Sequence, residues 1–459
     1  MVMAGQMHLH GLWRGLGRVA PAAALVLAGC DGGAPLPAAR MELPARYSHV
    51  APPPRPDAAL TTWWHGFHDP VLDQLVAQGL AQNVSLQIAA VRVREAEGNA
   101  RANGAVLSDS FSLSVDHTHY SDTAAGELAI NASPFGGRHK SAVAAASARV
   151  AAARYGAANA RLQLLGELTQ AYVDLRFAQA QMAQSRLDLA SRHTTLDSLN
   201  AQMKLGAATR LDIVSAEALV AETEARLPQL AAASARQEGK IATLLGQPAG
   251  TLGINLAYPG RQPVLATPGR IGIPADLVRR RPDIRGAEAQ YAAALGDLGQ
   301  ARAAFYPSLS LSGTISAPLD SLTGTSHSST LGLSLPLLSL PRLQAEADVA
   351  HATAEEAYLN WRLSVLSAVE DVETGLAAVA GSRLAVQRTQ RVVALNAEAL
   401  DLSRKLLESR GDVTALDVLD RERLVSQART SLAQSQRDYA SDTIALYVAL
   451  GLGPDPEAP

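Results

Sequence analysis

Cysteine is almost absent from the chain. The 459 residues hold one cysteine, Cys30, which excludes an internal disulfide framework and a thiolate metal site. Aromatic residues make up 4% and hydrophobic residues 47%, so the apolar content is mainly Ala, Leu and Val, which is typical of long packed helices. The formal net charge of -3, without a basic tail, predicts no nucleic-acid partner.

Clusters that carry chemistry are also scarce. His117 with His119, and His65 with His68, are pairs without a third or fourth ligand, so no metal site is predicted. No nucleophile elbow, P-loop or dinucleotide-binding glycine pattern occurs. We expect no catalytic residues, no metal and no cofactor, and therefore no enzyme.

The N-terminus reads as an export signal. Arg14 and Arg18 precede a short apolar run that ends in Leu-Ala-Gly-Cys at Cys30. This ending looks like a bacterial lipobox, whose cysteine receives a covalent lipid such as palmitate. No run of about 18 apolar residues follows, so no transmembrane helix is predicted. Residues 1–29 are expected to be a signal peptide, and 30–62 a lipidated, extended, Pro-rich tether.

Proline is missing where long helices are expected. None occurs over 135–227 or 342–453, and an Ala-rich stretch of about 60 residues predicts a helix of roughly 90 Å. Such helices belong to coiled coils, bundles or helical barrels. LGAATRLDIVSAE at 205–217 matches RGDVTALDVLDRE at 410–422, which indicates a tandem duplication. The two copies are placed at 63–272 and 273–452, followed by a tail over 453–459.

Each copy also carries two stretches of alternating apolar and Ser or Thr residues. Strands are expected at about 110–120, 127–134, 308–317 and 330–338. Their length suits a tilted bilayer crossing, with apolar residues toward lipid and hydroxyls toward a wet lumen. Four strands cannot close around a lumen, so several chains must each donate four, and three would form twelve strands.

Four stretches carry a family resemblance. They are IPADLVRRRPDIRGAEAQYAAALGDLGQARAAFYPSLSLSG (273–313), WWHGFHDPVLDQLV (63–76), AVEDVETGLAAV (368–379) and LDVLDRERLVSQARTSLAQ (416–434). The chain resembles TolC-like outer-membrane efflux proteins, especially the NodT-type lipoproteins that serve resistance-nodulation-division pumps. The resemblance implies a mainly α fold with a small β part: duplicated helical hairpins in an α-barrel, and four strands per chain in a trimeric twelve-stranded membrane β-barrel.

The resemblance also implies a function, partners and a location. The protein would be a passive exit duct for small molecules, bound to a periplasmic adaptor and an inner-membrane pump, with its helical part in the periplasm. In the family, aspartates at the LDVLD position, here Asp417 and Asp420, ring the periplasmic gate; a solvated helix face is the plain alternative. The turns that meet the adaptor would hold Gly206, Thr209, Gly411 and Thr414.

Two features of the sequence depart from the family pattern and leave other functions open. Ser133–Arg138 lacks the usual approach to the long helix, so the end of the first β-hairpin is not fixed, and Asp31 retains lipoproteins in the inner membrane of enteric bacteria. A duct for type I protein secretion fits nearly the same pattern. A lipid-anchored periplasmic coiled-coil scaffold fits Asp31, but it has no need for four alternating strands.

Overall fold

A computed structural model describes residues 36–48, 58–104, 108–118, 121–132, 137–256, 262–263, 274–318, 325–408 and 413–453. They belong to two compact units, each drawn from both sequence halves. Unit 1 comprises Met1–Arg40, Glu95–Ala152 and Ala287–Arg362; unit 2 comprises Met41–Arg94, Ala153–Gly286 and Leu363–Pro459. Cys30, Asp31 and Gly411 lie outside the described residues.

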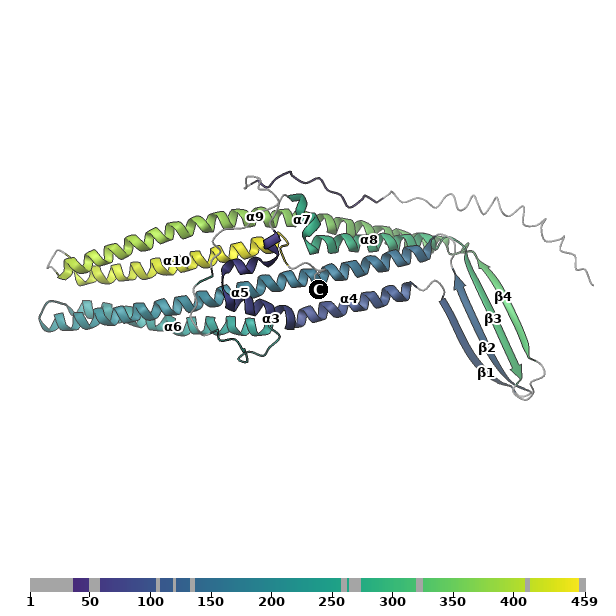
Figure 1. Cartoon of the computed structure of the whole chain (residues 1–459), viewed down its shortest axis with the longest axis horizontal. Coiled ribbons are helices and arrows are strands. Elements are labelled where there is room, and N and C mark those ends of the chain that lie inside the picture. Colours follow the sequence, from purple (N-terminus) through teal and green to yellow (C-terminus); the bar gives the residue numbers. More distant parts are fainter. Residues whose placement is uncertain are drawn as a thin grey trace, which may run out of the picture. The chain divides into compact units, whose positions relative to one another are not determined.

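The order of elements repeats along the chain, as the sequence predicts (Figure 1). After η1 (Ala58–Phe67) and α3 (Pro70–Gln82), the first series is α4 (Val84–Asn103), β1 (Ser108–Thr118), β2 (Ser121–Ala132), α5 (Arg138–Lys204) and α6 (Arg210–Leu244). After α7 (Pro274–Arg280), the second is α8 (Pro282–Ala303), β3 (Ser308–Pro318), β4 (Ser326–Ser334), α9 (Leu340–Glu408) and α10 (Ala415–Ala449).

The long helices confirm the inference from missing proline. Helix α5 has 67 residues and α9 has 69, so each is on the order of 100 Å long. Pro228 lies inside α6 without ending it. Pro282 begins α8, where its missing N–H leaves no helical hydrogen bond unmade.

Unit 1 holds one antiparallel sheet in the order β1-β2-β3-β4, so β1 and β4 are its edges. The register places Leu113, Ile315 and Leu331 on one face, and all three are exposed. Ser and Thr occupy the opposite face, where Thr314 Oγ1 lies 2.6 Å from Ser328 Oγ. The predicted separation of apolar and hydroxyl faces is confirmed.

Two strand bounds were predicted wrongly. Strand β2 begins at Ser121 and not at 127, because its small, polar first residues pair with β1 although they lack apolar alternation. Strand β4 covers Ser326–Ser334 and not 330–338, so Leu335 and Leu337 lie beyond it. Pro336 stands between these two leucines and has no N–H to extend the ladder.

The cores of the two units are built differently. In unit 2, the largest fully buried side chains include Leu72 of α3 and Leu168 and Tyr172 of α5. In unit 1, Tyr291 and Tyr358 pack beside Trp361, which is 1% exposed. Gly296 of α8 lies so close to α5 that an added Cβ would be 2.7 Å from the Cβ of Ala145. Small residues therefore set the spacing between α5 and α8.

Candidate functional site

The first candidate turn joins α5 to α6. Gly206 has φ +74, the left-handed conformation in which glycine commonly ends a helix. Thr209 is the N-cap of α6: its hydroxyl accepts from the Asp212 N–H, and the Asp212 carboxylate accepts from the Thr209 N–H at 2.8 Å. This reciprocal capping box satisfies two backbone donors at the start of α6.

The second turn repeats this geometry before α10. Thr414 is the N-cap, and Asp417 completes the capping box, with a Thr414 N to Asp417 Oδ2 distance of 2.8 Å. Thr209 and Thr414 thus cap α6 and α10 in the same way. Leu205 beside the first turn is 85% exposed, and Leu211 is 64% exposed. The first turn thus presents large apolar side chains to solvent.

The two proposed gate aspartates are both exposed on the first turns of α10. Asp417 accepts from the Thr414 hydroxyl and backbone N–H, and these hydrogen bonds lower its pKa. Asp420 is 2.6 Å from an Arg423 guanidinium nitrogen. The carboxylates are thus held by local partners, and both remain accessible to ions.

An apolar cluster in unit 2 joins the hairpin ends. Leu199 of α5, Ile213 and Ala216 of α6, and Leu419 of α10 are all buried and packed together. Leu419 lies between the exposed Asp417 and Asp420 in sequence, so α10 buries one face while its acids face solvent. This packing fixes where the acidic turn of α10 lies within the unit.

A buried carboxylate, which the sequence did not single out, links three helices close by. Glu422 of α10 has a side chain only 4% exposed, and its Oε1 accepts from Arg404 of α9 at 2.6 Å and Thr195 of α5 at 2.8 Å. On the same face of α10, Ser426 donates to Asp188 of α5 at 2.6 Å. These contacts connect the second hairpin to the first. The sequence gives no local signal for this pair, because Arg404 and Glu422 lie on different helices.

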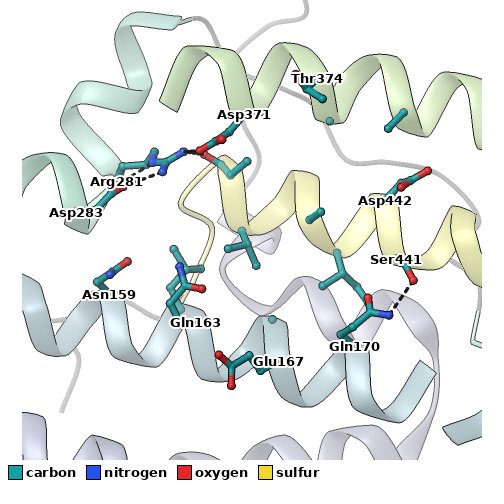
Figure 2. Close-up of a pocket in the computed structure, with 18 of the residues that line it drawn as sticks. Asn159, Gln163, Glu167, Gln170, Arg281, Asp283, Asp371, Thr374, Ser441 and Asp442 are labelled. Carbon is teal, nitrogen blue, oxygen red and sulfur yellow. Dashed lines mark hydrogen bonds and ion pairs between the residues drawn. The ribbon is translucent and has the colours of Figure 1, made fainter. Parts of the chain in front are cut away.

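A second polar region surrounds an open cavity of about 690 Å³ in unit 2. Figure 2 shows Arg281 reaching Asp283 and Asp371 at one end, and Gln170 bonded to Ser441 at the other. The Arg281 side chain is 12% exposed and also donates to the Ala449 carbonyl at 3.0 Å. In sequence, Arg279–Arg281 resembles a basic patch; Arg281 instead fixes the junction of α7, α8, α9 and α10.

The pair His65 and His68 is not part of a metal-binding group among the described residues. His65 Nδ1 is 2.7 Å from Asp73 Oδ1, which is a single ion-pair contact. The side chains of His117 and His119 lie outside the described residues. Within the described ranges, no group of three or more His, Cys, Asp or Glu residues could hold a metal ion. The same ranges contain no helix that is both long and apolar enough to cross a membrane.

Duplicated hairpins, each with one helix about 100 Å long, joined to a four-stranded sheet with one apolar face, define a channel-tunnel class of protein. The model of the "Outer membrane efflux protein" family matches residues 75–247 and 273–452. The chain belongs to this family, as the sequence resemblance predicted. It is an outer-membrane efflux protein whose long helices lie on the periplasmic side.

Curated relatives and solved structures agree. Nodulation protein T of Rhizobium leguminosarum bv. trifolii is 33% identical over 95% of this chain and 97% of its own length. The pyoverdine export outer membrane protein OpmQ of Pseudomonas aeruginosa is 29% identical over 94% of this chain and 95% of its own length. The outer-membrane channel OprN is 27% identical, with a TM-score of 0.83 over 92% of this chain and 99% of that chain.

The open-state MtrE channel of Neisseria gonorrhoeae has the same fold, with a TM-score of 0.80 over 94% of this chain and 100% of that chain at 24% identity. These matches, together with the four strands in one sheet, exclude the periplasmic scaffold alternative. The family is one of efflux proteins and not of enzymes.

Proposed function

We propose that three copies of this chain assemble into the exit duct of a tripartite efflux system of the resistance-nodulation-division type. The observation that carries the proposal is the sheet with two unlike open edges, β1 and β4. Unlike edges pair head to tail around an axis, which gives a closed ring. Two copies would supply eight strands, a barrel that side chains fill, whereas three supply twelve and leave a lumen.

The exit route follows from the faces of the sheet. The exposed apolar face, with Leu113 and Ile315, turns to lipid, and the face with Ser310 and Thr314 turns to the lumen. Small molecules then pass along a lumen lined by hydroxyl groups, with no dedicated binding site for one substrate. The lipid on Cys30 anchors each copy to the outer membrane.

The gate is assigned to Asp417 and Asp420. In a trimer, six exposed carboxylates at equivalent positions would surround one axis and attract cations. The first half offers a matched control, because Asp212 sits in the same capping box but is buried, and Ser215 stands where α10 has Asp420. Removing the Asp212 charge weakens the cap of α6 but leaves the six exposed carboxylates of Asp417 and Asp420 in the trimer unchanged.

The periplasmic adaptor is expected at the two turns, at Gly206, Thr209, Gly411 and Thr414. Exposed apolar side chains at the first turn, led by Leu205, support this placement, because contiguous exposed apolar surface marks protein interfaces. A photo-crosslinking residue at Leu205 should trap the adaptor. The same residue at Leu187, on α5 well before the turn and 65% exposed, is the control position.

The decisive experiment combines mass and conductance. Light scattering of the outer-membrane fraction should give three copies of the 48.0 kDa precursor, less the signal peptide, and planar bilayers should show a cation-selective pore. Asp417→Asn and Asp420→Asn should each lower cation selectivity, while Asp212→Asn should not. A monomer without conductance would refute the duct. A trimer whose selectivity ignores both aspartates would refute only the gate.

A further inference from the structure

The N-terminal segment before the helices is docked onto the fold, although the sequence predicts a free tether. Tyr47 is 4% exposed, as buried as a core residue. The next residue, Ser48, donates its backbone N–H to Glu373 Oε1 of α9 at 2.7 Å. In unit 1, the Tyr291 hydroxyl of α8 donates to the Pro37 carbonyl at 2.6 Å. We call residues 36–48 the strap.

Tyr47 is the main attachment of the strap. Burial raises the pKa of its phenol, and the nearby Asp276 and Glu373 carboxylates raise it further, so the ring stays neutral. Neither the Tyr47 hydroxyl nor Glu373 Oε2 has a hydrogen-bond partner among the described residues. The ring is therefore held by packing and by the Ser48 contact, not by its own hydroxyl.

Docking shortens the reach of the N-terminus. If the chain were free up to the buried Trp63, 33 residues would follow Cys30 and span up to about 110 Å when extended. With Pro37 held at Tyr291, seven residues remain, with a reach of about 25 Å. The docked strap thus removes most of the conformational freedom of the segment between Cys30 and the helices.

The same contact lies near the sheet. Tyr291 precedes the end of α8 by 12 residues, about 18 Å of helix, and five further residue steps lead from Ala303 to Ser308 at the start of β3. All of these residues belong to unit 1. With the Tyr291 side chain included, Cys30 cannot lie more than about 70 Å from Ser308 even when fully extended.

We propose that the strap is a positioning device for the lipid anchor: Tyr47 and Tyr291 hold residues 36–48 so that the acyl chains enter the membrane that contains the sheet. This proposal rests on the lipidation of Cys30 put forward above. The docked strap favours this membrane over the inner-membrane location that Asp31 suggests, because only about 25 Å of chain separates Cys30 from Pro37.

The test is the mobility of a nitroxide at the exposed Glu42, introduced as Glu42→Cys in the full lipidated chain, where acylated Cys30 does not react with the label. The docked strap predicts a slow spectrum. Tyr47→Ala should shorten the rotational correlation time by about threefold or more, as expected for an exposed chain end. Tyr47→Phe and Arg46→Ala should leave it unchanged, since one keeps the ring and the other alters an exposed side chain.

Reach is measured with a second label. A fluorophore at Ala38→Cys in liposomes should transfer energy to a dye at the lipid surface over about 25 Å, and Tyr47→Ala combined with Tyr291→Phe should broaden the distances toward longer values. A mobile wild-type spectrum, or a reach unaffected by the double variant, would overturn the strap. Mass and conductance of the same preparation test the duct separately, because a mobile strap in a conducting trimer refutes only this inference.

Discussion

Two glycines of α8 should respond in opposite directions to the same substitution. An added Cβ at Gly296 would lie 2.7 Å from the Ala145 Cβ and 2.8 Å from its Cα and N atoms, so Gly296→Ala collides with the backbone of α5. At Gly286, the nearest atom to an added Cβ is the Tyr155 Cβ at 3.6 Å, an ordinary contact. Gly286→Ala is therefore the matched control.

The magnitudes follow from two opposing effects. Replacing glycine by alanine inside a helix stabilises it by about 0.5–1 kcal/mol. Overpacking costs about 1–3 kcal/mol, and here no rotamer change can relieve it because the clash involves main-chain atoms. We expect Gly286→Ala to stabilise its region by up to about 1 kcal/mol, and Gly296→Ala to destabilise unit 1 by about 1–2 kcal/mol after the helix gain.

Hydrogen exchange followed by mass spectrometry resolves these changes locally. Amides of α8 near Gly296 should exchange roughly 5- to 30-fold faster in Gly296→Ala. Those near Gly286 should exchange more slowly in Gly286→Ala, by up to about fivefold. Equal protection of α8 in both variants would mean that α5 and α8 are not in close contact. Gly296→Ser should behave like Gly296→Ala, because the Cβ causes the clash.

Three further predictions concern the hairpin ends. Thr414→Ala should cost about 1 kcal/mol of capping and speed exchange in the first turn of α10 about fivefold, while Thr414→Ser should not. Hydrogen bonds from Thr414 lower the pKa of Asp417, so Asp417 stays charged and caps α10 at neutral pH, and this contribution is lost as pH falls below about 4. In Thr414→Ala the pKa of Asp417 should rise, so the cap should fail at a higher pH. An unchanged acid midpoint of hydrogen exchange in Thr414→Ala would contradict this. Arg404→Met should leave the buried Glu422 carboxylate poorly paired and destabilise the start of α10, by about 1–3 kcal/mol after discounting the half-exposed arginine. Adding Glu422→Leu should restore stability in thermal unfolding.

The sequence predicts most of the fold because the signals are local. Missing prolines reveal α5 and α9, and Gly206 and Thr209 mark the first turn through backbone conformation and capping. The alternation of Leu and Ser in β3 is a period-two pattern that needs no partner to be seen. These features depend on neighbours within a few residues along the chain.

The errors and omissions depend on distant partners. Strand β2 extends back to Ser121 because β1 pairs with it, and pairing is invisible in its own composition. Ser48 bonds to Glu373 across 325 residues, so residues 36–48 read in sequence as part of a free tether although they are docked. Glu422 and Arg404 form their buried pair only because two helices pack side by side.

The two duplicated turns share the residues that cap their helices but differ in the side chains that they expose. Both halves keep the threonine cap and its aspartate, because every helix start must satisfy its first backbone donors. In the first half the aspartate is buried, and apolar side chains such as Leu205 face solvent instead. In the second half Asp417 is exposed and Asp420 replaces the serine. The two turns thus differ in exposed charge, with Asp417 and Asp420 exposed at the second and Asp212 buried at the first. The exposed pair of acids supports the proposed gate at the second turn, and the exposed Leu205 supports the proposed adaptor contact at the first of the two turns.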